Sequence, residues 1–206
     1  MPDLPGFREA VEGDREQQFR TLGYTFWNRE MVDALSAQMK RLVGSASGSG
    51  WWLELAAGTG RLAAELARSG VPVLATDDGS QEDARVGSGH RRVRCGTWVL
   101  RCSLREAVAR FRPERVLVTW PPLGSGVTLD LLAGRLPGGE GVRVLVVIGE
   151  RDGASELPPD PSLLPPGWTG ERLPDVEQWL VGFLDPDGEA GRGEVWVYQR
   201  SELGEA

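Results

Sequence analysis

The sequence is poor in the residues that build metal sites and disulfide frameworks. Its 206 residues include only two cysteines, Cys95 and Cys102, and one histidine, His90. Two cysteines give neither a disulfide framework nor a zinc-binding spacing. A single histidine excludes any site that is built on several histidines. We therefore expect no metal centre and a fold that rests on its apolar core.

Long apolar runs and a basic excess are also missing. No stretch of about 18 apolar residues is present, so no membrane-spanning helix is expected. The start of the chain is acidic and contains proline, and it lacks a signal-peptide pattern, so we expect a cytoplasmic protein. Acidic residues outnumber basic ones by 30 to 23, whereas a domain that grips phosphates usually carries a basic excess. Nucleic-acid binding is therefore not favoured.

What remains is the composition of a folded domain with generous loops. Hydrophobic residues make up 40% and charged residues 26% of the chain, which is ordinary for a globular protein. The stretch 44–50 contains only Gly, Ser and Ala, as flexible linkers do. We place a boundary there, between an N-terminal helical cap over residues 1–43 and a main domain over residues 44–206. The cap is predicted to hold a helix over 14–22 and an aromatic cluster over 24–27.

Strand-like and helix-like patterns alternate along the chain. Short apolar runs predict five strands, and the last of them is apolar throughout, as in a strand that is buried on both faces. The predicted strands cover residues 51–56, 71–76, 97–101, 115–119 and 143–148. Apolar residues at three- and four-residue spacing predict helices, the first of them capped by Asn28. The predicted helices cover residues 29–43, 61–69, 104–111 and 128–136.

The order of these elements predicts the fold class. Strands that alternate with helices form parallel units in a doubly wound sheet. After the fifth strand, residues 176–184 and 194–199 have the pattern of two strands joined by a glycine-rich turn. We therefore predict an α/β fold, a doubly wound and mostly parallel sheet with helices on both faces and a C-terminal antiparallel hairpin.

A glycine-rich turn follows the first predicted strand. Residues 54–60 read Glu-Leu-Ala-Ala-Gly-Thr-Gly. Glycines at such a turn let the backbone approach a ligand closely, and the helix that follows offers unpaired N–H groups. The second strand ends in Asp77, where an acid commonly binds the ribose hydroxyls of an adenosine cofactor. The turn and this acid together predict a cofactor site.

Two kinds of cofactor fit this turn. Residues 58–63 match the G-x-G-x-x-A form of the dinucleotide fingerprint, which favours a nicotinamide-dependent oxidoreductase. Glu54, however, lies in the end of the first strand, where its carboxylate would repel a pyrophosphate and attract an ammonium group. S-adenosyl-L-methionine carries an ammonium group and no phosphate. No Tyr-x-x-x-Lys pair or catalytic histidine supports the oxidoreductase.

In these residues the sequence resembles the class I S-adenosylmethionine-dependent methyltransferases. Their first motif, (D/E)-x-G-x-G-x-G, is matched by Glu54, Ala56, Gly58 and Gly60, with Ala56 in place of the first glycine. The ribose-binding acid of the family falls on Asp77, with Asp78 beside it. The fourth motif of the family, (D/N)-P-P-(Y/F/W), falls on residues 120–123, which read Trp-Pro-Pro-Leu.

The resemblance implies a seven-stranded sheet that binds S-adenosyl-L-methionine and transfers its methyl group to an unidentified small-molecule or protein substrate. Trp120, Pro121 and Pro122 would form the substrate wall. Ser103 is the local candidate for a contact to adenine, because the family's acid after the third strand is missing. Trp120 cannot accept a hydrogen bond, which argues against transfer to a base or amide nitrogen. The alternative is a methyltransferase-like binding protein that has lost catalysis.

Overall fold

The computed structural model describes residues 25–44, 50–80, 95–122, 124–150, 162, 164–182 and 193–201. The predicted helix over 14–22, most of the linker and His90 lie outside these ranges. Among the described helices, none has both the length and the apolar character that a membrane span requires.

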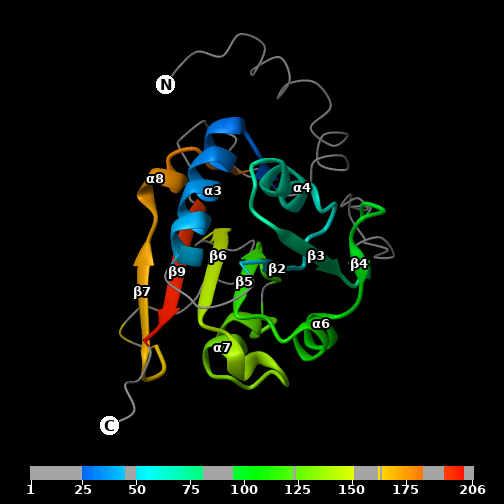
Figure 1. Ribbon diagram of the computed structural model, residues 1–206, viewed down its shortest axis with the longest axis vertical. Coiled ribbons are helices and arrows are strands. Elements are labelled where there is room, and N and C mark those ends of the chain that lie inside the picture. Colours follow the sequence, from blue (N-terminus) through cyan, green and yellow to red (C-terminus); the bar gives the residue numbers. More distant parts are fainter. Residues whose placement is uncertain are drawn as a thin grey trace.

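A seven-stranded sheet forms the centre of the molecule (Figure 1), in the order β4-β3-β2-β5-β6-β9-β7. Its strands are β2 (Trp52–Leu55), β3 (Val73–Asp77), β4 (Leu100–Arg101), β5 (Arg115–Thr119), β6 (Val144–Glu150), β7 (Trp168–Arg172) and β9 (Gly193–Arg200). Strands β2 to β6 pair in parallel, whereas β9 runs antiparallel to both β6 and β7. When the seven strands of this sheet are numbered 1 to 7 along the chain, their order in the sheet is 3-2-1-4-5-7-6. This is the order of the class I methyltransferase-like fold, and the predicted fold class is confirmed.

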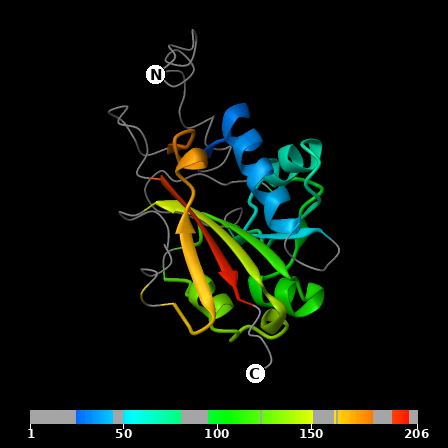
Figure 2. The ribbon, with the colours of Figure 1, turned by 60° about the vertical axis from the view of Figure 1, so that its left-hand side comes forward.

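Helices cover both faces of the sheet (Figures 1 and 2). One face carries α3 (Arg29–Gly44), α4 (Arg61–Arg68) and α8 (Pro174–Glu177), and the other carries α6 (Leu104–Phe111) and α7 (Val127–Leu132). A short 3-10 turn, η1 (Gly139–Gly141), precedes β6. Each face has its own apolar cluster, because the central strands are apolar on both sides.

The N-terminal segment is joined to the C-terminal part of the chain. Asn28 caps α3 as predicted, since its Oδ1 accepts a hydrogen bond from Met31 N at 2.7 Å. Its Nδ2 donates to the carbonyl oxygen of Trp179 at 2.7 Å. Beside it, β1 (Thr25–Phe26) pairs antiparallel with β8 (Val181–Gly182). The separation of a cap over residues 1–43 from the main domain stays a prediction.

The predicted closing hairpin is wrong in one of its strands. Its last strand, β9, pairs with β7 (Trp168–Arg172) and not with residues 176–184. Residues 176–184 instead include the end of α8 and the short strand β8. The sequence misled because β7 is an edge strand in which only Trp168 is buried, so it carries no apolar run.

The third predicted strand is also shorter than expected. Residues 97–101 were predicted as one strand, but only Leu100 and Arg101 pair with β3. Residues 97–99 form a turn and a bend, and the side chains of Trp98 and Val99 lie against Gly60 of the glycine turn that follows β2.

Candidate functional site

The candidate site lies where the carboxyl ends of β2, β3 and β5 meet. These three strands are parallel neighbours, with β2 in the middle. Parallel strands end at the same edge of a sheet, which is where ligands bind in open α/β folds. Glu54, Asp77 and Thr119, one from each strand, are buried at this edge. Glu54 and Asp77, which the sequence assigns to one cofactor site, therefore lie at the same edge of the sheet, and their binding of a cofactor stays a prediction.

Glu54 is a buried carboxyl group with incomplete hydrogen bonding. Its side chain is 1% exposed, and Oε1 accepts a hydrogen bond from Thr119 Oγ1 at 3.4 Å. Oε2 is buried and makes no hydrogen bond of good geometry among the described residues, although the backbone N–H of Ala63 favours the charged carboxylate. Burial is the main reason why the pKa of Glu54 rises to about 8; Thr119 and the backbone at Ala63 oppose that rise, and the charge of Asp77 adds to it. Without a positive partner, Glu54 is therefore mostly protonated at neutral pH.

Asp77 is buried as well, but the chain itself supplies its hydrogen-bond donors. Oδ2 accepts from Gly58 N at 2.8 Å, and Oδ1 accepts from Gly79 N at 2.7 Å and from Cys95 Sγ at 3.4 Å. A carboxylate offers about four acceptor positions, so roughly one is left for a ligand. Asp77 thus holds the glycine turn against the end of β3. The neighbouring Asp78 is exposed, and its Oδ1 accepts from Ser80 N at 2.8 Å in a local turn.

The glycine turn has the left-handed backbone that its glycines permit. Gly58 has φ +53° and Gly60 has φ +71°. Ala56, which stands in place of the first glycine of the motif, adopts φ +54°. An L-residue pays a steric penalty in this region that glycine avoids. The replacement at position 56 therefore leaves the shape of the turn intact and adds backbone strain.

Residues 95–99, which we call the strap, lie across this turn. Gly96 N donates to the carbonyl oxygen of Thr59 at 3.2 Å, and Trp98 Nε1 donates to the carbonyl oxygen of Gly60 at 3.2 Å. A Cβ on Gly60 would lie 2.4 Å from Val99 Cγ2. Packing of the strap thus requires glycine at position 60, whereas its predicted contact with a cofactor stays a prediction. No pattern in the sequence predicts the strap.

Trp120 and Pro121 directly follow β5, which ends at Thr119. Trp120 N donates to the carbonyl oxygen of Ile148 at 2.7 Å, and the residue has φ +52°. Its Nε1 is buried and has no partner among the residues that the structure describes. Pro121 is buried and Pro122 is exposed. The proposed substrate wall is therefore a rigid feature of this edge, and its role stays a prediction.

Ser103 begins helix α6. Its Oγ accepts from Glu106 N at 3.3 Å and donates to Glu106 Oε2 at 2.8 Å, while Ser103 N donates to the same oxygen at 2.9 Å. These bonds from the Ser103 backbone and side chain lower the pKa of Glu106. They form a capping box, which accounts for Ser103 without a ligand. Its predicted contact with adenine stays a prediction.

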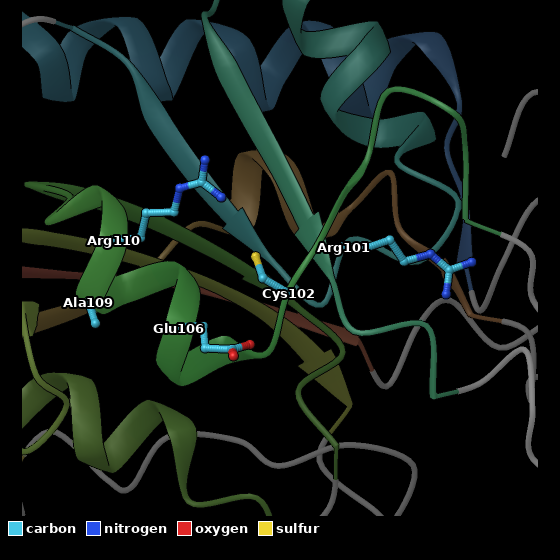
Figure 3. A pocket seen from close by; sticks show the side chains of 5 residues that line it. All are labelled: Arg101, Cys102, Glu106, Ala109 and Arg110. Carbon is cyan, nitrogen blue, oxygen red and sulfur yellow. The ribbon is translucent and has the colours of Figure 1, made fainter.

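A hollow of about 560 Å³ lies beside α6. It is lined by Arg101, Cys102, Glu106, Ala109 and Arg110 (Figure 3). The side chains of the two arginines extend in different directions, so they do not form one anion site. Burial raises the pKa of the Cys102 thiol, which keeps it protonated and weakly reactive. None of the predicted site residues lines this hollow.

Two contacts at the site were missed by the sequence reasoning. The Thr119 hydroxyl faces Glu54, and the Cys95 thiol faces Asp77. The position of Thr119 at the end of the strand next to that of Glu54 was a usable signal. Cys95 had no such signal, because its position depends on the strap. Within the described residues no group of His, Cys, Asp or Glu side chains is placed to hold a metal ion.

Two solved structures are similar to this one at low sequence identity. "Putative methyltransferase yhhF from Escherichia coli" is 15% identical, over 85% of this chain and 88% of that chain, with a TM-score of 0.47. "Crystal Structure of the SAM Dependent Methyltransferase from Agrobacterium tumefaciens" is 12% identical, over 82% of this chain and 62% of that chain, with a TM-score of 0.44. No family model and no curated protein matches the sequence. The order and directions of the strands carry the fold assignment.

Proposed function

We propose that the chain is an S-adenosylmethionine-dependent methyltransferase. The observation that carries this proposal is Glu54, whose carboxyl group is buried at the carboxyl end of β2 with one oxygen unpartnered. A buried polar atom without a partner is rare and calls for an explanation. An ammonium group at this corner would give Oε2 a donor and would stabilise the charged form of Glu54. A pyrophosphate offers Oε2 no donor and would destabilise the charged form of Glu54, which disfavours a nicotinamide cofactor.

The residues around Glu54 divide the binding of such a cofactor among them. Glu54 would hold the ammonium group. Asp77 would offer its remaining acceptor position to a ribose hydroxyl, while its other positions keep the glycine turn in place. The exposed carboxylate of Asp78 lies next to it. The site therefore fits a cationic adenosine ligand that has no phosphate.

The chemistry asks little of the chain beyond positioning. S-adenosylmethionine, when bound, supplies a methyl group on a positively charged sulfur that needs no further activation. The chain has to orient the acceptor and exclude water, and orientation alone accounts for a large part of such rate enhancements. Trp120 and the two prolines after it are suited to that task, because the left-handed backbone and the proline rings leave them little freedom. No histidine lies among the described residues, and none is required.

Calorimetry with S-adenosylhomocysteine tests the proposal. We expect wild-type protein to bind it at pH 7, and Glu54→Gln to bind at least tenfold more weakly, about 1.4 kcal/mol. The matched control is Glu171→Gln, an exposed glutamate on β7, which should leave binding unchanged. Because the ammonium group would ionise Glu54, binding should release close to one proton, measured in two buffers of different ionisation enthalpy. Binding of NAD instead of S-adenosylhomocysteine would overturn the proposal.

A second candidate is a binding protein of the same fold without catalysis. The strap and the chain's own donors around Asp77 favour it, because they already use part of the space and hydrogen bonding that a cofactor would need. Incubation with cofactor labelled in the methyl group and a cell extract separates the two. Cofactor binding without any labelled acceptor would favour the binding protein.

A further inference from the structure

Helix α6 carries an exposed face that is rich in arginine. Arg105, Arg110 and Arg112 are exposed, whereas Ala107 and Val108 of the same helix are buried in the apolar cluster on this side of the sheet. Successive residues of a helix are turned by about 100°, so the exposed positions from Arg105 to Arg110 fall within one sector of about 140°. Arg112 follows at the C-terminal end of the helix. Three positive charges are therefore exposed within about two turns of helix.

These arginines differ from other exposed arginines in having no acidic partner. None of the three forms an ion pair with a carboxylate among the described residues. Four exposed arginines elsewhere do so, in the pairs Arg29 with Asp33, Arg68 with Glu65, Arg135 with Asp130 and Arg172 with Glu177. Acidic residues outnumber basic ones by 30 to 23 in the whole chain. The unpaired arginines of α6 are therefore a local feature, and a shortage of acids does not explain them.

The acids next to this face are directed to other partners. Glu106 lies four residues before Arg110, a spacing at which a carboxylate commonly pairs with an arginine. Its Oε2 instead accepts hydrogen bonds from the backbone and the hydroxyl of Ser103, at 2.9 Å and 2.8 Å. A carboxylate oxygen of Glu114, after the helix, lies 3.7 Å from a guanidinium nitrogen of buried Arg115. The described chain therefore leaves the charge of this helix face available to an anionic partner.

The segment that leads into α6 exposes large apolar side chains. Trp98 is 58% and Leu100 is 40% exposed, and among the described residues only Leu129 joins them as an exposed large hydrophobic side chain. The indole of Trp98 is held in place by the hydrogen bond from its Nε1 to Gly60. Leu100 lies on β4, the edge strand that runs into α6 (Figure 1). Arginines and an exposed ring together suit a single-stranded nucleic acid, because its phosphates bind cations and its bases stack on aromatic side chains.

The hollow beside α6 connects these two elements. Its lining includes Arg101 of β4 together with Ala109 and Arg110 of α6 (Figure 3), so the edge strand and the exposed helix face border the same hollow. The side chains of Arg101 and Arg110 extend in different directions. A single small anion does not bridge two such groups, whereas successive phosphates of a polymer can reach each of them separately. The arrangement therefore favours a polyanion.

We propose that the exposed face of α6 and the sheet edge at β4 bind single-stranded nucleic acid. The arginines of α6 contact phosphates, and Trp98 stacks on a base. The exposed tryptophan favours a nucleic acid over an acidic protein segment, in which stacking rings are few. The net charge of the chain, −7, does not exclude such a surface, because salt at about 0.1 M screens exposed charges that are more than about 10 Å apart. The inference goes beyond the proposed function and does not depend on it, since the arginines of α6 take no part in the candidate cofactor site.

Fluorescence anisotropy with labelled oligonucleotides tests the proposal. Oligouridylate and oligothymidylate of about 15 nucleotides, each with fluorescein at the 5′ end, are titrated with the full chain in the absence of S-adenosylhomocysteine. We expect at least one of them to bind at about 50 mM salt, and the triple variant Arg105→Gln/Arg110→Gln/Arg112→Gln to bind it at least tenfold more weakly. The plot of log affinity against log salt concentration should be less steep for this variant by about 2, because each phosphate contact on a single strand contributes roughly 0.7 to the slope.

The triple variant Arg29→Gln/Arg68→Gln/Arg135→Gln is the matched control. It removes the same charge from exposed arginines elsewhere on the chain, and it should bind as the wild type does. An equal loss in the two triple variants, or a wild type that binds neither oligonucleotide at the lower salt, overturns the inference. Polyglutamate of matched charge that competes as well as unlabelled oligonucleotide also overturns it, and would indicate an acidic protein partner instead.

Photocrosslinking of the wild type supplies a measurement that needs no variant. Oligonucleotides that contain 4-thiouridine or 4-thiothymidine should crosslink within residues 98–112, as mapped by mass spectrometry after proteolysis. Crosslinks confined to other parts of the chain overturn the inference, even if the α6 variant does not fold. The proposed function fails separately, because absence of S-adenosylhomocysteine binding by calorimetry overturns that function alone and leaves the oligonucleotide measurements to decide the inference.

Discussion

The ends of β2 and β3 carry one buried acid each, and the two acids differ in what the chain provides for them. Asp77, on β3, accepts hydrogen bonds from two backbone N–H groups and a thiol. Glu54, on β2, accepts one long hydrogen bond from Thr119 and keeps an unpartnered oxygen. Burial raises the pKa of Glu54 to about 8. The contrast shows that the chain itself supplies most hydrogen-bond donors for Asp77, whereas one oxygen of Glu54 has no partner among the described residues.

The largest effect that tests this contrast is the pH dependence of stability. The folded chain keeps a proton on Glu54 that the unfolded chain loses above about pH 4.5. Stability should therefore fall as pH rises from about 4.5 to about 8, by up to about 1.4 kcal/mol per pH unit. Urea unfolding at several pH values measures this. Subtracting the unfolding free energy of Glu54→Gln from that of the wild type at each pH isolates the contribution of Glu54. A difference that does not change with pH would contradict a raised pKa.

The next effect concerns Asp77. Asp77→Ala removes the acceptor for Gly58 N and Gly79 N, and hydrogen bonds to a charged group contribute about 1.5–3 kcal/mol each. We expect a loss of about 3 kcal/mol of stability in urea unfolding at pH 7. Asp78→Ala is the matched control, because Asp78 is exposed and bonds only locally, and it should cost well under about 1 kcal/mol.

The same variant tests whether Asp77 contributes to cofactor binding. Asp77→Ala should also weaken binding of S-adenosylhomocysteine, by about 1–3 kcal/mol. Unchanged affinity in a folded Asp77→Ala protein would remove Asp77 from the cofactor site and leave it a structural residue alone.

A smaller effect tests the strap, whose Cys95 contacts Asp77. Gly60→Ala places a Cβ 2.4 Å from Val99 and 2.6 Å from Trp98, at φ +71°. Gly134→Ala has a similar φ of +64° and nothing within 4 Å. Both variants carry the backbone penalty, so their difference in thermal unfolding measures the packing of the strap. We expect Gly60→Ala to be less stable than Gly134→Ala by about 1–3 kcal/mol. Equal stabilities would show that the strap does not hold the turn in solution.

The smallest expected effect comes from Ala56, between the two acids. Ala56→Gly relieves a left-handed residue, which favours the folded state by about 1–2 kcal/mol. Glycine also has greater conformational freedom in the unfolded chain, which lowers this gain in stability by about 0.4–1 kcal/mol. A net gain of up to about 1.6 kcal/mol in urea unfolding is expected. A loss of stability would mean that the methyl group of Ala56 makes a packing contact of its own.

Strong local patterns made most of the fold predictable. The strands β5 and β6 are continuous apolar runs, and α6 begins with a Ser-x-x-Glu capping box that the sequence displays. The corner shared by Glu54 and Asp77 followed from placing their strands side by side. Elements that depend on distant partners were harder to predict, because β7 has a single buried residue and β8 only two residues in all.

The same distinction holds within the site. The identities of Glu54, Asp77 and Trp120 were visible in the sequence, since motif spacing is a local property. Their hydrogen-bonding state was not visible. Whether the side-chain oxygens of Asp77 and Glu54 have hydrogen-bond partners depends on Gly58, Cys95 and Thr119, which belong to other strands and loops. Charge and spacing thus predicted which residues lie close together. Only the fold shows which of them has a hydrogen-bond acceptor without a partner.

The pairing of β1 with β8, together with the bond from Asn28 to Trp179, has a consequence for the integrity of the chain. Helix α3 is fastened at a point 151 residues away in sequence and shares its apolar cluster with the sheet. A protease that cuts between α3 and β2 would therefore leave two fragments that migrate together in gel filtration. The two fragments would separate only when a denaturant unfolds them.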